Sequence, residues 1–280
     1  MTVKQYSNIS TYLSENLDFL EKREAVNNLL IGIPISLKNE KVLNPFPVLL
    51  SVHAGNSIVF SAIQTPPKNL LVSGDALNHQ SAAVPLIDFM IQNNIIVPGV
   101  IGPKKVSTFF AEKWCAKNNI QWQTKYEQLI YRLDEIKEIK YTNGFCRKAK
   151  MKDLDIVGNW FHAFAKEAMD EDDRQGAILT AENKITTGGL FIWENNGRAV
   201  SMAAASRPSR NGIAINYVYT PAEFRGHGYA TAVVGKLTEL MLKKYRFCSL
   251  FTDQANPTSN SIYSKIGYRP IEEFRMIEFI

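Results

Sequence analysis

Apolar residues in the first half of the chain follow a helical spacing and then gather in short β-rich runs. Between Tyr12 and Leu30 they recur at mixed three- and four-residue intervals, which predicts helix. Pro34 and the segment Asn44-Pro45-Phe46-Pro47 are expected to end this helical region. The pattern then predicts strands over 47–53, 57–64 and 70–72, a helix over 81–92, a strand over 95–101, a helix over 106–117 and a strand over 126–133.

The second half repeats this order of patterns. Leu154, Val157, Phe161 and Phe164 mark one face of a long helix, and Asn195-Asn196-Gly197 is a typical hairpin turn between two strands. The expected elements are a strand over 145–149, helices over 151–169 and 181–187, strands over 190–194, 199–206 and 213–219, a helix over 228–245, a strand over 248–253, a helix over 259–266 and a strand over 268–280.

The repeated order predicts two α/β domains of similar topology. Each half has about 140 residues, which is a common size for a domain. The charged stretch 134–140 is the expected junction, with the second domain beginning near residue 141.

Composition and charge narrow the class of protein. Of the 280 residues, 45% are hydrophobic and 21% charged, as in ordinary globular proteins, and no apolar run reaches the ~18 residues of a membrane helix. The net charge of +5 is spread evenly, without the basic stripe of a nucleic-acid binder. The three cysteines are widely spaced and form no CxxC pair, so no zinc or other metal site is expected. The polar N-terminal segment is unlike a signal peptide, and a cytoplasmic location is expected.

The most informative segment runs from Tyr217 to Ala230. A β-rich run is followed by a loop with two glycines, and an amphipathic helix begins directly after it. A helix N-terminus presents unpaired N–H groups, glycines permit close approach, and Arg225 adds a positive charge, so the segment predicts a phosphate cradle. A P-loop is excluded because His227 follows Gly226, and a dinucleotide fingerprint is excluded because Thr231 replaces its third glycine.

Two ordered blocks in this half resemble the GNAT superfamily of N-acyltransferases. Arg225, Gly228 and Ala230 form the Arg-x-x-Gly-x-Ala pattern of that family's acyl-CoA loop. The later segment from Asn256 to Tyr268 resembles its second block, with Asn, a small residue, an aliphatic residue before Tyr, then Lys, Gly and an aromatic residue at the family's spacing.

The resemblance covers about residues 144–280, and the two-domain layout resembles tandem GNAT proteins with a degenerate N-terminal half. It implies an α/β (α+β) fold of two GNAT-like domains, each with a mixed, mostly antiparallel sheet flanked by helices. Residues 1–138 would form a degenerate domain without a CoA motif, and residues 141–280 the catalytic domain.

The resemblance also implies roles for particular residues. Loop amides would hold the CoA pyrophosphate, the preceding strand and Asn256 would contact the pantetheine arm, and Tyr263 would protonate the leaving thiolate. The implied cofactor-binding residues are Tyr217, Val218, Tyr219, Arg225, Gly226, His227, Gly228, Tyr229, Ala230 and Asn256. A core position remains open for Tyr263, and a turn or helix-start position for Asn256.

The N-terminal half departs from the pattern. At the equivalent place, Val72 to His79 contains one glycine, no arginine and an aspartate where phosphate would sit. Asp75 would repel a pyrophosphate and is interpreted as a helix cap, so no CoA site is expected in this half.

The implied activity is transfer of the acetyl group of acetyl-CoA to a primary amine of a small molecule or peptide. The alternative is a CoA-binding regulatory module without turnover. No general base is singled out: the candidates are Glu194, Glu223 and the acidic run Asp170 to Asp173, which also fits a solvated loop. His162 is expected to be a partly buried structural residue. Oligomeric state and acceptor identity are left open.

Overall fold

The computed structural model describes residues 1–38 and 43–280, which form two compact units. Unit 1 comprises Met1–Ile130, Thr252–Ala255 and Pro270–Ile280. Unit 2 comprises Tyr131–Phe251 and Asn256–Arg269. Each contains a mixed sheet with helices on both faces, which confirms the expected α/β class.

Unit 1 contains a mostly antiparallel sheet ordered β1-β2-β3-β4-β5-β12-β6, in which β4 and β5 pair in parallel. Its strands are β1 (Thr2–Gln5), β2 (Val48–Ala54), β3 (Ser57–Gln64), β4 (Leu70–Gly74), β5 (Gly99–Pro103), β6 (Trp122–Leu133) and β12 (Arg269–Phe279). Its helices are α1 (Ile9–Leu20), η1 (Glu21–Arg23), α2 (Asn28–Leu37), α3 (His79–Gln92) and α4 (Lys104–Asn118).

The two faces of the unit 1 sheet differ in polarity. Beneath α3 and α4 lies an apolar core that includes Phe60, Phe110 and Ile277. On the α1 and α2 side a row of buried serines crosses β2, β3 and β4, in which Ser51 pairs with Ser61 and Ser61 with Ser73. Tyrosine hydroxyls or asparagine amides from other elements hydrogen-bond each serine, so this polar row is internally satisfied.

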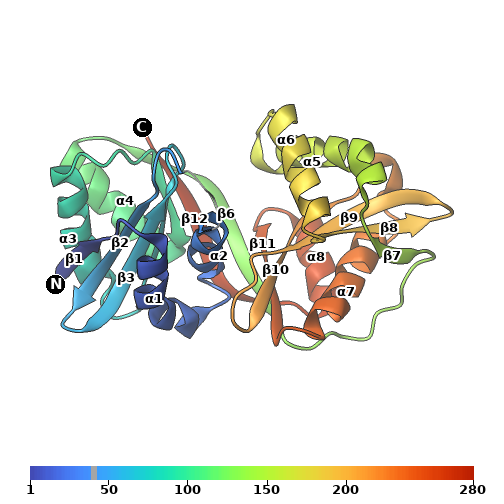
Figure 1. Cartoon of the computed structure of the whole chain (residues 1–280), viewed down its shortest axis with the longest axis horizontal. Helices are drawn as coiled ribbons and strands as arrows, with labels where there is room; N and C mark the ends of the chain where they lie inside the picture. Colours follow the sequence, from blue (N-terminus) through green and yellow to red (C-terminus); the bar gives the residue numbers. More distant parts are fainter. Residues whose placement is uncertain (39–42) are drawn as a thin grey trace. The chain divides into compact units, whose positions relative to one another are not determined.

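The last strand of the chain lies in unit 1 rather than with the residues that precede it. Phe274, Met276 and Glu278 of β12 pair antiparallel with Pro103, Ile101 and Gly99 of β5. In Figure 1 the red β12 lies among the blue and green strands. The compact units are therefore not two contiguous halves divided near residues 138–141: β6 passes into unit 2 after Ile130, and residues 270–280 complete unit 1. Strand pairing over so long a sequence separation leaves no local pattern.

Unit 2 contains the end of β6, from Tyr131 on, and a sheet ordered β11-β10-β9-β8-β7, in which β10 and β11 pair in parallel. Its further strands are β7 (Phe145–Lys148), β8 (Leu190–Asn195), β9 (Arg198–Ser206), β10 (Gly212–Tyr219) and β11 (Phe247–Asp253). Its helices are η2 (Met151–Asp153), α5 (Leu154–Met169), α6 (Arg174–Thr186), η3 (Ala222–Phe224), α7 (Tyr229–Leu242) and α8 (Pro257–Ile266).

Alternating residues divide the unit 2 sheet into two packed faces. Leu190, Ile192 and Met202 pack with apolar residues of α5 and α6 in one core. The helix α7 packs on β9, β10 and β8, and Figure 1 shows it on the side opposite α5 and α6. The amphipathic spacing of α5, with buried Val157 and Phe161, explains why this helix lies flat on the sheet.

Several local predictions were wrong. Pro34 lies inside α2 instead of ending the helical region, β5 begins at Gly99 rather than at residue 95, and α6 begins at Arg174 rather than at residue 181. The strand β1 was not predicted. Pro34 is the seventh residue of α2, where its missing N–H costs one intrahelical hydrogen bond. The helix continues past it, because the N–H of Lys38 donates to the carbonyl of Pro34.

The placement of β12 predicts a specific loss of stability in unit 1. Ile277 is fully buried in the unit 1 core, so Ile277→Ala is expected to cost about 2–5 kcal/mol and to speed amide hydrogen exchange in β4 and β5. Ile271→Ala on the same strand is the matched control, because Ile271 is 41% exposed. Faster exchange confined to the strands of unit 2 would contradict the placement.

Candidate functional site

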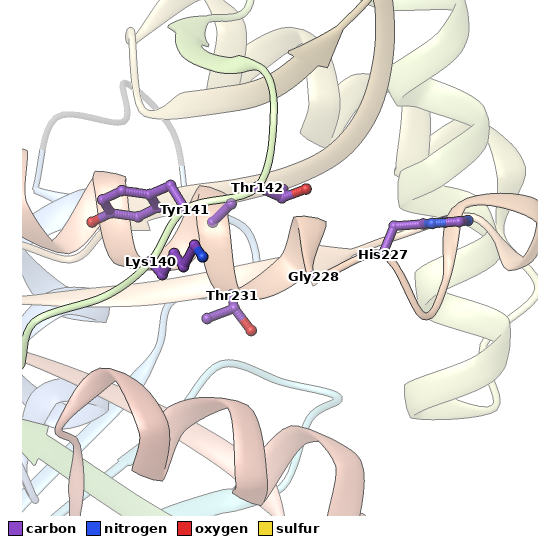
Figure 2. A pocket seen from close by; sticks show the side chains of 7 residues that line it. Lys140, Tyr141, Thr142, His227, Gly228 and Thr231 are labelled. Carbon is purple, nitrogen blue, oxygen red and sulfur yellow. The ribbon is translucent and has the colours of Figure 1, made fainter.

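The loop before α7 forms one wall of a cavity of about 360 Å³. Gly226 and Gly228 have φ angles of +82° and +77°, a conformation that residues with a Cβ adopt at a cost, so the glycines permit this turn. The cavity is lined by Lys140, Tyr141, Thr142, His227, Gly228, Thr231 and Ala232. Figure 2 shows Lys140 and Thr231 close to the start of the helix, with the His227 ring directed away from them.

The N-terminus of α7 is open to a ligand. Gly228 is its N-cap and, having no side chain, makes no side-chain capping hydrogen bond to the first turn. A Cβ built on either Gly226 or Gly228 would meet no atom within 4 Å. The first N–H groups of a helix have no intrahelical acceptor and carry the positive end of the helix dipole. With the Lys140 ammonium beside it, this end of α7 suits an anion such as a phosphate.

Arg225 has local partners rather than a free guanidinium. It donates to Glu167 Oε2 at 2.7 Å and to the carbonyl of Thr220 at 2.9 Å, and it lies 5.7 Å from the ring centre of Tyr219. The hydrogen bond to Glu167 is the main reason that the pKa of Arg225 is raised. Since half of the Arg225 side chain is exposed, an incoming phosphate could share it with Glu167.

The strands β10 and β11 separate just before the glycine loop. Their parallel ladder runs from Gly212–Phe247 to Ala214–Ser249. Beyond Asn216 the pairing of β10 with β9 shifts through a bulge, where Tyr217 has φ +49°. The backbone of Tyr217 and Val218 is thus outside the β11 ladder and the regular β9 register, so a ligand could reach its polar groups. Tyr219 pairs again with Met202, and its carbonyl accepts a hydrogen bond from Ser201 Oγ at 3.1 Å.

The second predicted block forms α8. Asn256 is its N-cap, and its side chain accepts a hydrogen bond from the N–H of Ser259 at 3.0 Å. Tyr263 is 7% exposed and packs near the rings of Tyr131 and Tyr268, with ring centres 6.2 and 6.1 Å away. Burial raises the pKa of Tyr263, so its hydroxyl stays protonated at neutral pH. Asn256 therefore lies at a helix start and Tyr263 in the core, which were the two structural alternatives to their binding and catalytic roles. Neither position excludes contact with a ligand.

The carboxylates considered as bases have structural partners. Glu194 accepts from Arg147 at 2.5 Å, and Asp172 contacts His162 at 2.6 Å and Lys166 at 2.8 Å. Two further acids of the run shape the chain: Asp170 ends α5 in a left-handed conformation, and Asp173 caps α6 by accepting from the N–H of Gly176. Glu223 lies exposed in η3.

Sequence reasoning missed three residues that line the cavity or bond to its neighbouring elements. Lys140 was assigned only to the domain junction, whereas it lines the cavity. Glu167 on α5 contacts both Arg225 and the hydroxyl of Tyr219. Lys184 on α6 hydrogen-bonds to Ser206 on β9. No motif marks these residues, because each acts on an element distant in sequence.

The equivalent turn of unit 1 is filled. A Cβ on Gly74 would meet His79 and Phe60 at 2.7 Å, in contrast to the open space at Gly228. Asp75 Oδ1 accepts from the N–H groups of Leu77 and Asn78, so it holds the turn that leads into α3, and the N-cap is Asn78. The Asp75 side chain therefore caps the turn that precedes α3, and not the helix itself as expected.

The described ranges, 1–38 and 43–280, contain no cluster of three or more His, Cys, Asp or Glu residues placed to hold a metal ion. Among the helices in those ranges, none is long and apolar enough to cross a membrane.

Comparison with known proteins finds a likeness to one family in the second half of the chain. The model of the acetyltransferase (GNAT) family matches residues 155–268. No curated protein matches the sequence.

Solved structures extend the likeness to the whole chain. A GNAT-family acetyltransferase from Colwellia psychrerythraea is 14% identical with a TM-score of 0.58, and the match covers 100% of this chain and 99% of that one. A protein from Drosophila reaches a TM-score of 0.69 at 10% identity, covering 99% and 98% of the two chains. A tandem GNAT protein from the clavulanic acid biosynthesis pathway reaches 0.58 at 9% identity, covering 100% and 98%. These likenesses confirm the tandem fold.

The local bonds of the acidic run predict a structural role for it. Asp173→Ala removes the α6 cap and is expected to lower the free energy of unfolding by about 0.5–2 kcal/mol, measured by chemical denaturation. Asp170→Asn is the matched control, because asparagine tolerates the left-handed conformation as well as aspartate does. Equal stability of the two variants would show that the cap contributes nothing.

Proposed function

We propose that the chain transfers the acetyl group of acetyl-CoA to a primary amine of a small molecule or peptide. The match of the acetyltransferase (GNAT) family model to residues 155–268 supports this proposal. The observation that carries this proposal is the open N-terminus of α7, where two glycines leave space beside unpaired N–H groups. Likeness to this family alone supports acetyl transfer in general, and the direct attack and the amine acceptor are parts of the proposal.

The residues around α7 fit the phosphates of CoA. The N–H groups at Tyr229 and Ala230, with the Lys140 ammonium, supply donors and positive charge where a pyrophosphate would lie. His227 is exposed at the rim and lines the cavity. The backbone of Tyr217 and Val218 at the bulge would hydrogen-bond to the pantetheine arm, and Asn256 could contact the same arm from the start of α8.

Acetyl-CoA supplies the thioester carbonyl that the amine attacks. An alkyl amine has a pKa of about 10.4, so presenting it neutral at pH 7 costs roughly 4.6 kcal/mol. The bulged backbone at Tyr217 to Tyr219 offers N–H groups for the negative charge that develops on the carbonyl oxygen. Tyr263 would then donate its hydroxyl proton to the departing sulfur.

The high pKa of Tyr263 limits its value as an acid. A thiol has a pKa of about 8.5, so a tyrosine whose pKa burial raises above 10 transfers its proton uphill. The uphill transfer supports only a modest contribution of Tyr263 to the rate. For the same reason the alternative, a CoA-binding regulatory module without turnover, stays open to test. A screen of amines for CoA release distinguishes the two: binding of CoA without release for any amine would favour the module.

We propose further that CoA binds unit 2 alone. The turn at Gly74 in unit 1 is filled by His79 and Phe60 and held by the Asp75 carboxylate, which would repel a phosphate. One CoA per chain is the stoichiometry expected in calorimetry, and two would contradict the asymmetry.

Gly228→Val is expected to weaken CoA binding at least tenfold, or about 1.4 kcal/mol, because the side chain occupies the space at the first N–H groups of α7. Isothermal calorimetry on the full chain measures this effect. The matched control is Gly197→Val in the β8–β9 turn, where φ is +73° and a Cβ also meets no atom within 4 Å. Both variants carry similar backbone strain of about 1–3 kcal/mol, and only the first is expected to lose CoA. Equal affinities in the two would count against the cradle.

Tyr263→Phe is expected to lower kcat by about 10²-fold, the low end of the range for general acids, while CoA affinity stays within twofold. The ring and its packing remain in this variant. Tyr131→Phe, which removes the hydroxyl of the neighbouring buried tyrosine, is the control and is expected to keep kcat. A wild-type kcat in Tyr263→Phe, where chemistry limits turnover, would show that another group protonates the sulfur.

A further inference from the structure

The cavity beside α7 has two parts that differ in their polar groups. At Gly228 it meets the N-terminus of α7, where the first backbone N–H groups have no intrahelical acceptor. From Ala232 on, the backbone offers no free donor, because the N–H of Ala232 donates to the carbonyl of Gly228 at 3.0 Å. The part of the cavity farther along the helix, the side pocket, is therefore bordered by polar side chains instead: Lys140, Thr142 and Thr231.

The segment that carries two of these side chains lies close against α7. A Cβ built on Gly235 would meet Ile139 Cδ1 at 2.7 Å and Tyr141 Cε1 at 3.2 Å, so the glycine permits the close approach. The Tyr141 hydroxyl donates to the carboxylate of Glu239, which is four residues farther along the helix than Gly235. Lys236 Nζ donates to the same carboxylate at 2.6 Å. The segment is thus held against α7, and the acid beside it is already paired.

The other side of this segment is fixed by β8. Tyr141 stacks on Trp193, with ring centres 6.1 Å apart and an angle of 27° between the rings. Trp193 Nε1 donates to the carbonyl of Asn143 at 3.1 Å. Lys140 and Thr142 alternate with these anchored residues, so their backbone positions are set before a ligand arrives.

The polar side chains of the side pocket are unpaired within residues 1–38 and 43–280. There Lys140, Thr142 and Thr231 make no side-chain hydrogen bond or ion pair. Figure 2 shows the Lys140 nitrogen directed toward the first turn of α7, with Thr231 beside it. An ammonium and two hydroxyls that line one cavity suit an anion with several acceptor oxygens, such as a phosphate monoester. The cavity of about 360 Å³ has the size of a small-molecule site, so it can hold more than a pyrophosphate.

We propose that the side pocket binds the 3′-phosphate of CoA, and that Lys140 selects CoA over analogues that lack this group. The inference rests on the proposed function, because it concerns the same cosubstrate site. In CoA only the ribose separates the 3′-phosphate from the pyrophosphate, so a pyrophosphate at the N-terminus of α7 brings the monoester beside it. Lys140 is the one lysine or arginine among the described residues that line the cavity, and a compact ammonium can contact both phosphate groups.

The first test compares CoA with 3′-dephospho-CoA in calorimetry on the full chain, so that it does not depend on turnover. The two ligands differ only in the 3′-phosphate. CoA is expected to bind at least tenfold more tightly, the size of effect typical of hydrogen bonds to a charged group. Equal affinities would overturn the proposal.

The second test assigns the preference to the lysine. Lys140→Met keeps the length of the side chain and removes its charge, so the tenfold preference for CoA is expected to fall below twofold. Lys140→Arg is expected to restore part of it, which a purely structural role would not require. Lys244→Met is the matched control: it makes the same change in net charge just beyond the C-terminus of α7, away from the cavity, and is expected to keep the preference. A preference that survives in a folded Lys140→Met would overturn the assignment.

A third measurement distinguishes the 3′-phosphate of CoA from free phosphate. Inorganic phosphate is expected not to bind the chain saturated with CoA, because the side pocket is then filled. Phosphate that still binds the saturated chain, and loses this binding in Lys140→Met, would show a site for the free anion and overturn the proposal.

The failure of this inference is distinguishable from failure of the proposed function. If neither CoA nor 3′-dephospho-CoA binds, or if no amine releases CoA, acetyl transfer is contradicted. If both ligands bind with equal affinity, only the role of the side pocket is contradicted.

Discussion

The separation of β10 from β11 is the constraint on which the rest of unit 2 depends. Three residue pairs join these parallel strands, and the pairing ends at Ala214 and Ser249. After that point β10 bulges and then enters the glycine loop, so one short segment presents its backbone to the gap and passes directly to the start of α7. A strand fully paired on both sides would have no polar backbone groups for a ligand. The site thus depends on backbone groups that β11 leaves without a partner, and α5 and α7 pack against the strand.

The two units use the same architectural position in different ways. In unit 1 the space between the first two helices and the sheet holds neutral serines, each hydrogen-bonded to a tyrosine or asparagine. In unit 2 the corresponding space holds the ammonium of Lys184, which donates to Ser206, and Ser206 donates in turn to Asn216. The two units therefore fill this space with groups of different charge.

The sequence predicted what is encoded locally and not what depends on distant partners. The strand, glycine loop and helix around Gly228 were predicted because a turn, an N-terminus and an amphipathic face all leave marks within a few residues. The contact of Lys184 with Ser206 joins an α6 side chain to β9, and neither residue type signals the other. The ion pair of Arg225 with Glu167 was missed for the same reason. The pairing of β12 with β5 was missed because register is set by tertiary contacts across the chain.

The position of β12 has a consequence for synthesis of the chain on the ribosome. All other strands of unit 1 are made before residue 134, yet the strand that sits between β5 and β6 comes last. Until residues 270–280 emerge, β5 presents an unpaired edge, and such edges invite pairing with other chains. The unit translated first must therefore complete its fold after the helices and strands of unit 2 have been made. Nascent chains halted before residue 270 should need a holding chaperone more than finished chains do.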